Sequence, residues 1–203
     1  MFISYKDFIV LFTLLIASST FADYNTGVNA FNSGDYRTAY KEFLPEANKG
    51  NAEAQWAIGM MNYHGNPMQS DISEATAWFK KAGNQGHSES SLVIANMYFS
   101  GEYFDKSKSK SLEWMEKAAE QGSVMAMYKT GLFYGRGDTV PQDKIKAKKW
   151  FKLAYSQVDS DSKQSNIASF TLMEDIEKAI DRMERGSFDS NIPIRIDLGG
   201  IWW

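Results

Sequence analysis

A fixed interval of 36 residues runs through most of the chain and constrains its fold more than any other feature. Trp78, Trp114 and Trp150 lie 36 residues apart. Four further series keep the same step: Gly59, Ala95 and Gly131; Gly65, Gly101 and Gly137; Ala82, Ala118 and Ala154; and Met61, Met97 and Phe133. A period of this length is typical of stacked supersecondary units, each too small to bury its apolar face without its neighbours.

Each interval contains the start and stop signals of two helices. In the first full unit, Asn51 is a candidate N-cap, and the Gly-Asn-Pro run at 65–67 ends the helix that follows. A second helix is expected to begin at Asp71, because Asp71 and Glu74 have the spacing of a capping box. Apolar residues then recur at three and four positions until Gly86, which is a candidate C-terminal glycine. Each unit is therefore predicted to be a helix pair.

The same signals predict where the other helices lie. Helix pairs are expected over 88–100 with 107–121 and over 124–134 with 143–155, and a degenerate leading pair over 23–32 and 35–49. After a polar break at 159–162, the amphipathic segment 163–185 is predicted to cap the last pair. The predicted fold class is all-α, a right-handed α/α solenoid with a C-terminal capping helix. The expected domains are a signal peptide at 1–22, a degenerate repeat at 23–50, repeats at 51–86, 87–122 and 123–158, a capping helix at 159–186 and an apolar tail at 187–203.

The repeated positions also resemble a known family. The residues that carry the likeness in the first full unit are Ala52-Glu53-Ala54-Gln55, Gly59, Met61, Gly65, Ala75, Trp78-Phe79, Lys81-Ala82 and Gln85-Gly86. They look like the Sel-one-like repeat, a relative of the tetratricopeptide repeat with a longer loop between its helices, and the third unit adds the family's loop signature at 140–143. The second unit departs from the pattern at 88–91 and Ala95, and the third has Val158 in place of the closing glycine. The resemblance implies adaptor proteins, many of them exported in bacteria, and implies no reaction.

The first residues have the pattern of an export signal. Lys6 precedes the apolar run 8–16, and Thr20-Phe21-Ala22 satisfies the small-x-small rule for signal peptidase. Cleavage after Ala22 is expected, which places the mature chain in the periplasm or outside the cell. The apolar run is shorter than the ~20 residues of a spanning helix, although an uncleaved anchor stays an alternative. No integral membrane segment is expected after cleavage.

The last residues differ in kind from the repeats. Ile192, Ile194, Ile196 and Leu198 alternate with other residues before the terminal Trp202-Trp203, which is the periodicity of a strand. A helical repeat protein has no sheet to receive a lone strand. The tail is therefore expected either to lie along the array or to pair with something outside it, including a second copy of the chain.

Composition and motifs argue against catalysis. The formal net charge is -3, so no polyanion such as nucleic acid is expected as a partner, and the absence of cysteine excludes disulfides and thiol chemistry. His64 and His87 fall at helix boundaries and are interpreted as capping or solvated residues, since zinc needs three or four convergent ligands. Five lysines near the third unit's second helix either attract acidic partners or lipid head groups or form a solvated helix face: Lys144, Lys146, Lys148, Lys149 and Lys152. No catalytic residue, metal or cofactor is predicted.

The predicted function is therefore the binding of a protein or peptide. In solenoids the first helices of the pairs usually line the binding wall, and the positions that vary between units are candidate contacts. The candidates are Trp56, Met60, Tyr63, Val93, Asn96, Phe99, Lys129 and Leu132, together with Trp202 and Trp203 of the tail. An adaptor of the cell envelope is the leading hypothesis. An immunity protein against an envelope-acting toxin and a cell-wall hydrolase are the alternatives.

Overall fold

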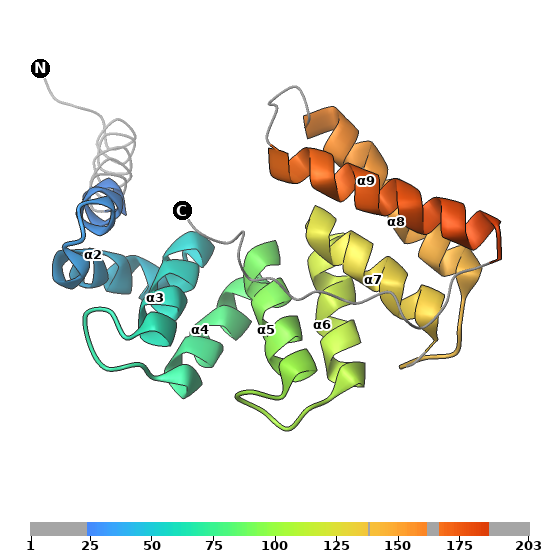
Figure 1. The fold of residues 1–203 in the computed structure, drawn as a ribbon. Helices are drawn as coiled ribbons and strands as arrows, with labels where there is room; N and C mark the ends of the chain where they lie inside the picture. Colours follow the sequence, from blue (N-terminus) through green and yellow to red (C-terminus); the bar gives the residue numbers. More distant parts are fainter. Residues whose placement is uncertain (1–23, 138, 162–166, 187–203) are drawn as a thin grey trace, which may run out of the picture. The chain divides into compact units, whose positions relative to one another are not determined.

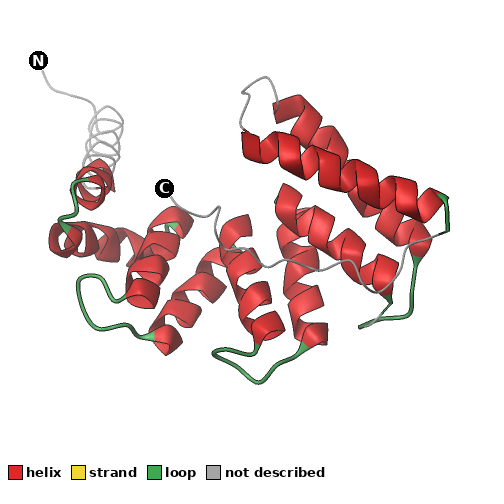
Figure 2. Cartoon of the chain, viewed as in Figure 1, coloured by secondary structure: helices red, strands yellow, loops and turns green. Residues whose placement is uncertain are grey.

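The computed structural model describes residues 24–137, 139–161 and 167–186 of the chain. Within these ranges every regular element is a helix (Figures 1 and 2), so the predicted all-α helical repeat fold is confirmed. The chain divides into two compact units between Gln85 and Gly86. This boundary coincides with the end of the first full 36-residue repeat.

Unit 1 consists of the helix at 24–32 followed by α2 (Tyr36–Asn48), α3 (Ala52–His64) and α4 (Ile72–Asn84). Successive helices from α2 onward pack against each other. The core is formed by buried side chains from all of these labelled helices, including Phe43, Ile58 and Trp78. Trp78, the first of the repeated tryptophans, is thus a buried core residue.

Unit 2 contains α5 (Ser88–Ser100), α6 (Lys108–Glu120), α7 (Val124–Arg136), α8 (Lys144–Asp161) and α9 (Ile167–Glu184). Each helix packs against the next along the chain from α5 to α9. The helix pairs of the second and third repeats have the same bounds, 36 residues apart, except at the end of α8.

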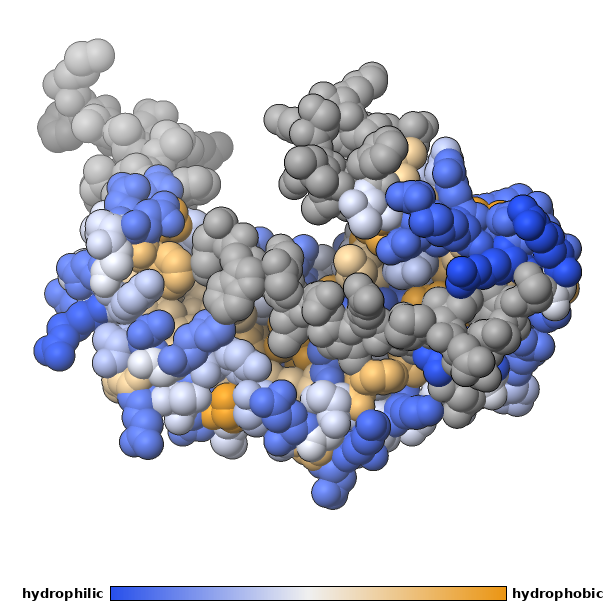
Figure 3. All heavy atoms as spheres, viewed as in Figure 1, coloured by the Kyte–Doolittle hydropathy of each residue, from blue (hydrophilic) through white to orange (hydrophobic). Residues whose placement is uncertain are grey.

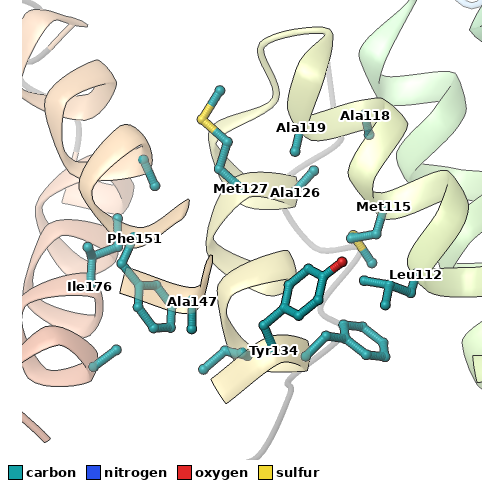
Figure 4. Close-up of a cluster of buried hydrophobic side chains, with 14 of the residues drawn as sticks. Leu112, Met115, Ala118, Ala119, Ala126, Met127, Tyr134, Ala147, Phe151 and Ile176 are labelled. Atoms are coloured by element: carbon teal, nitrogen blue, oxygen red, sulfur yellow. The ribbon is translucent and has the colours of Figure 1, made fainter. Parts of the chain in front are cut away.

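The core of unit 2 continues from α5 to α9. Figure 4 shows Tyr134 beside Leu112 and Met115, and Phe151 next to Ile176 of α9. The predicted capping segment therefore contributes apolar side chains to the same core as the repeats. Two of the repeated tryptophans, Trp114 and Trp150, are partly buried against this cluster.

Identical hydrogen bonds hold the loop between the two helices of each full repeat. The backbone N–H groups of Asp71, Ser107 and Asp143 donate to carbonyl oxygens nine residues earlier, each at 2.9 Å. The side chains of the same three residues then accept the N–H three positions onward at 2.8, 3.3 and 2.9 Å, which caps the second helix. Gly65, which has a φ of +75°, provides the left-handed turn that starts the first of these loops.

Close contact between the two helices of a repeat explains the small residues inside the first helices. A Cβ added at Gly131 would lie 2.5 Å from Phe151, and one added at Gly59 would lie 2.6 Å from Phe79. The second repeat has Ala95 at the same position and the thinner side chain Met115 opposite in place of phenylalanine. A glycine on the first helix thus faces a phenylalanine on the second, and an alanine faces a methionine, so the space between the helices stays filled.

The leading pair uses the same contact with a shorter connection. A Cβ added at Gly27 would lie 2.7 Å from the ring of Phe43. Phe43 is 36 residues before Phe79, whereas Gly27 is 32 residues before Gly59. The degenerate repeat therefore keeps the helix contact and loses four residues from the segment between the two contact positions.

The end of the third repeat differs from the sequence-based expectation. A break was predicted at 159–162, but α8 continues through Asp161. Position 158 is where the other repeats place a glycine with a positive φ, such as Gly86 and Gly122. Val158 is instead buried in the core of unit 2, and a branched side chain disfavours the left-handed turn that would end the helix. None of the helices in the described residues is long and apolar enough to span a membrane.

Candidate functional site

The first helices of the repeats begin with a polar cap at the same position in each unit. Asn51, His87 and Ser123 accept hydrogen bonds from the N–H group three residues onward at 3.0, 3.2 and 3.3 Å. For His87 the acceptor is the ring Nδ1, which confirms its interpretation as a capping residue. These caps fix the start of α3, α5 and α7, and with it the register of the candidate contact residues on these three helices.

Most of the predicted contact residues on these helices are buried. They are Trp56, Met60, Val93, Asn96, Lys129 and Leu132. Trp56 packs on Phe79 of α4, with ring centroids 5.2 Å apart. Trp202 and Trp203 lie outside the described residues. Whether any of these side chains contacts a partner stays a prediction.

Tyr63 and Phe99 are the two predicted residues that remain partly exposed. They occupy equivalent positions in the first and second repeats, at the C-terminal ends of α3 and α5. The ring of Phe99 lies edge-on to Phe133 of α7 at 5.7 Å, and the Nζ of Lys106 lies 5.9 Å from its centroid. Phe99 is therefore held in place while part of its ring faces solvent.

Polar side chains join the first helix of a repeat to the C-terminal end of the second. Gln85 Nε2 donates to Gln55 Oε1 at 2.7 Å, and the equivalent pair in the second repeat is Ser91 Oγ donating to Gln121 Oε1 at 2.8 Å. Asn96 Oδ1 is buried without a hydrogen-bond partner in the described structure. A buried acceptor of this kind costs about 1–3 kcal/mol of stability.

The electrostatics of unit 2 include one interaction that periodicity did not indicate. The Tyr134 hydroxyl of α7 donates to Glu116 Oε1 of α6 at 2.6 Å. Burial, together with this carboxylate, raises the pKa of Tyr134 to about 12. Sequence comparison gives no signal for the pair, because the two residues are 18 apart and Glu116 does not recur at the 36-residue step, although the tyrosine recurs as Tyr98.

The described side chains do not assemble a metal site. No group of three or more His, Asp or Glu residues within these ranges is placed to hold an ion. Burial lowers the pKa of His64, whose ring lies edge-on to Tyr63 at 5.0 Å. What the arrangement offers chemically is a set of aromatic, aliphatic and amide groups on rigid helices, which suits contact with another polypeptide.

Tandem helix pairs with repeated caps and loops define an α-helical repeat protein, a class that presents extended surfaces to other proteins. The family model of the Sel1 repeat matches residues 52–87, 89–123 and 124–159, and the chain belongs to this family. The predicted resemblance is therefore confirmed. Sel1 repeats are protein-interaction modules, which supports the general prediction of a protein partner.

Two solved structures share the fold of this chain. A Sel1 repeat protein from Oxalobacter formigenes is 25% identical, with a TM-score of 0.56, and the match covers 66% of this chain and 96% of that one. A protective antigen of uropathogenic Escherichia coli strains, c5321, which displays an SLR fold, is 24% identical with a TM-score of 0.52; the match covers 64% of this chain and 34% of that one. The immunity protein Pa5087 from Pseudomonas aeruginosa is 18% identical with a TM-score of 0.47, over 83% of this chain and 70% of that one. None of the curated proteins matches the chain significantly.

Proposed function

We propose that this chain is an exported, non-catalytic module that binds a segment of a partner protein through its first helices. The observation that carries the proposal is the contrast between a constant frame and variable side chains. Caps and loop hydrogen bonds recur at the 36-residue step, as in the bonds made by Asp71 and Ser107. The first-helix position occupied by Tyr63, Phe99 and Gly135 differs in every repeat, and its two aromatic side chains are partly exposed. Such variation in a fixed frame is expected of a surface adapted to one ligand.

Tyr63 and Phe99 are the contact residues that the geometry favours most. Aromatic side chains supply much of the binding energy at protein interfaces, and partly exposed rings are available without unfolding the repeat. Phe99 is also held against Phe133, so little side-chain freedom would be lost when a partner binds. We expect truncation of both rings to weaken the complex by about tenfold or more.

The test is an affinity pull-down from envelope extract with the wild-type chain and a Tyr63→Ala/Phe99→Ala variant. The matched control is Met68→Ala/Tyr103→Ala, which removes exposed apolar side chains from the inter-helix loops. The proposal expects one protein to be retained by the wild type and the control and lost by the variant, with helicity by circular dichroism unchanged. Equal retention by all three chains would place the binding surface elsewhere, and retention by none would remove the support for the function.

The identity of the retained protein separates the specific roles. A toxin whose activity the chain abolishes would assign the immunity role, whereas a component of a multiprotein envelope complex would assign the adaptor role. The exported location has its own test, because N-terminal sequencing of the protein from the native host should find Asp23 as the first residue. A chain that still begins with Met1 would contradict cleavage.

A further inference from the structure

The outward face of α8 differs from the same face of the second helices before it. The third repeat has Ile145 at the position where the first two repeats have Ser73 and Ser109. It has Leu153 at the position where they have Lys81 and Lys117. Lys81 and Lys117 lie over the rings of the repeat tryptophans, with Nζ 3.7 and 4.7 Å from the ring centroids. The third repeat has thus replaced polar by apolar side chains at two surface positions.

These two apolar side chains face solvent even though α9 packs against α8. Ile145 is 85% exposed and Leu153 is 42% exposed. They lie eight residues apart on one helix, and residues at this spacing project from the same face. Packing of the capping helix therefore does not account for them.

The charge of the same face is reversed between the second and third repeats. Glu113 and Glu116 of α6 correspond to Lys149 and Lys152 of α8. Hydrophilic side chains cover the part of unit 2 where α8 and α9 are drawn (Figures 1 and 3), and the sequence shows that those of the first half of α8 are lysines. A basic face of this kind contrasts with a chain whose formal net charge is -3.

The lysines and the apolar side chains line one groove, of about 680 Å³, between α8 and the end of α9. Its lining residues are Lys144, Ile145, Lys148, Lys149, Lys152, Leu153, Ser156, Met183 and Glu184. Lys148 forms an ion pair with Glu184, the one acid of the lining. Lys144 and Lys149 form no ion pair within the described part of the chain. The groove has an apolar floor and an excess of positive charge.

We propose that this groove binds an acidic segment of a partner protein. An apolar side chain of that segment lies on Ile145 and Leu153, and its carboxylates pair with Lys144, Lys149 and Lys152. A membrane surface fits less well, because a flat layer of anionic head groups would meet Glu184 and would not enter a concave site. The site lies on a second helix, whereas the proposed function places its partner on the first helices, so the two proposals can fail separately.

The test measures fluorescence anisotropy of a labelled synthetic peptide of repeating Leu-Glu-Glu against the full chain at low salt. A Lys149→Glu variant is expected to weaken binding by about tenfold, whereas Lys41→Glu on the exposed face of α2, which changes the net charge equally, should leave it unchanged. A second variant, Ile145→Ser/Leu153→Lys, installs the residues that the earlier repeats have at these positions and should also weaken binding. Because all these side chains are exposed, the fold should tolerate every variant.

Three outcomes would overturn the proposal. If a peptide with serine in place of leucine binds as tightly as the Leu-Glu-Glu peptide, the binding is a nonspecific attraction between charges and does not use Ile145 and Leu153. Stronger binding to phosphatidylglycerol vesicles than to the peptide, with the same loss in Lys149→Glu, would assign the face to a lipid surface. Peptide binding that appears only after deletion of residues 187–203 would show that the chain's own tail is the occupant.

Discussion

The pairing of a small residue on the first helix with a ring on the second provides the sharpest test of the repeat. In the Gly131→Ala variant the new Cβ would lie 2.5, 2.7 and 3.0 Å from three ring atoms of Phe151. Carbon atoms in contact are normally about 3.5–4.0 Å apart, so the ring has to move by about 1 Å. Phe151 is fully buried and has no room to move freely.

The magnitude follows from two opposing effects. Alanine is better than glycine inside a helix by about 1 kcal/mol, whereas overpacking a core costs about 1–3 kcal/mol. We therefore expect Gly131→Ala to lower the free energy of unfolding by about 1 kcal/mol. Phe151→Met alone should also cost about 1 kcal/mol, because it leaves space beside the glycine. The double variant recreates the Ala95 and Met115 pair of the second repeat and should be nearly as stable as the wild type.

Urea unfolding followed by circular dichroism measures all four chains of this double-mutant cycle. The expected coupling between the two substitutions is about 1 kcal/mol or more, in the stabilising direction. The reverse cycle in the second repeat, Ala95→Gly with Met115→Phe, should give a coupling of the same sign. If the stability changes of the two single variants instead add to within about 0.5 kcal/mol, the two positions are not coupled. The close contact between the glycine and the ring would then not explain the small residues.

Three further predictions concern caps, the end of α8 and a tyrosine. Asp143→Ala removes the acceptor for the Lys146 N–H and should lower the free energy of unfolding by about 1 kcal/mol, whereas Asp143→Asn should preserve most of it in the same urea assay. Val158→Gly removes a buried side chain and adds a helix breaker, so a loss of about 3 kcal/mol is expected, with faster amide hydrogen exchange at 159–161; unchanged exchange would contradict the role given to Val158. Folded Tyr134 has its pKa raised to about 12 from the usual 10.0, so its contribution to stability is complete below pH 10 and is lost as the pH rises toward 12; Tyr134→Phe should show a smaller loss of stability over this range than the wild type.

Periodicity predicted the helices well wherever both a cap and a terminal glycine were present. The helix at 88–100 was predicted at its observed bounds, because His87 and Gly101 mark its two ends. The predicted end of α8 was wrong, because the polar run at 159–161 does not by itself decide whether a helix continues or stops. Burial of Val158 in three dimensions, not local sequence, carries that helix onward.

The candidate sites were harder to predict than the helices. Variation between repeats identifies positions but not their exposure, so buried residues such as Met60 and Leu132 were selected together with the partly exposed Tyr63 and Phe99. The basic cluster on α8 was visible in the sequence. Its meaning changed only when the exposure of Ile145 showed that apolar and basic side chains share one groove.

The uninterrupted end of α8 has a consequence for how such a chain can grow. A duplicated 36-residue block can be inserted after Gly86 or Gly122 without disturbing any cap, because each glycine returns the backbone to the starting point of another pair. After Val158 the helix runs on and no such return point exists. Gene duplication can therefore add whole repeats after Gly86 or Gly122 but not directly after Val158. New binding surface would evolve by insertion of repeats inside the array.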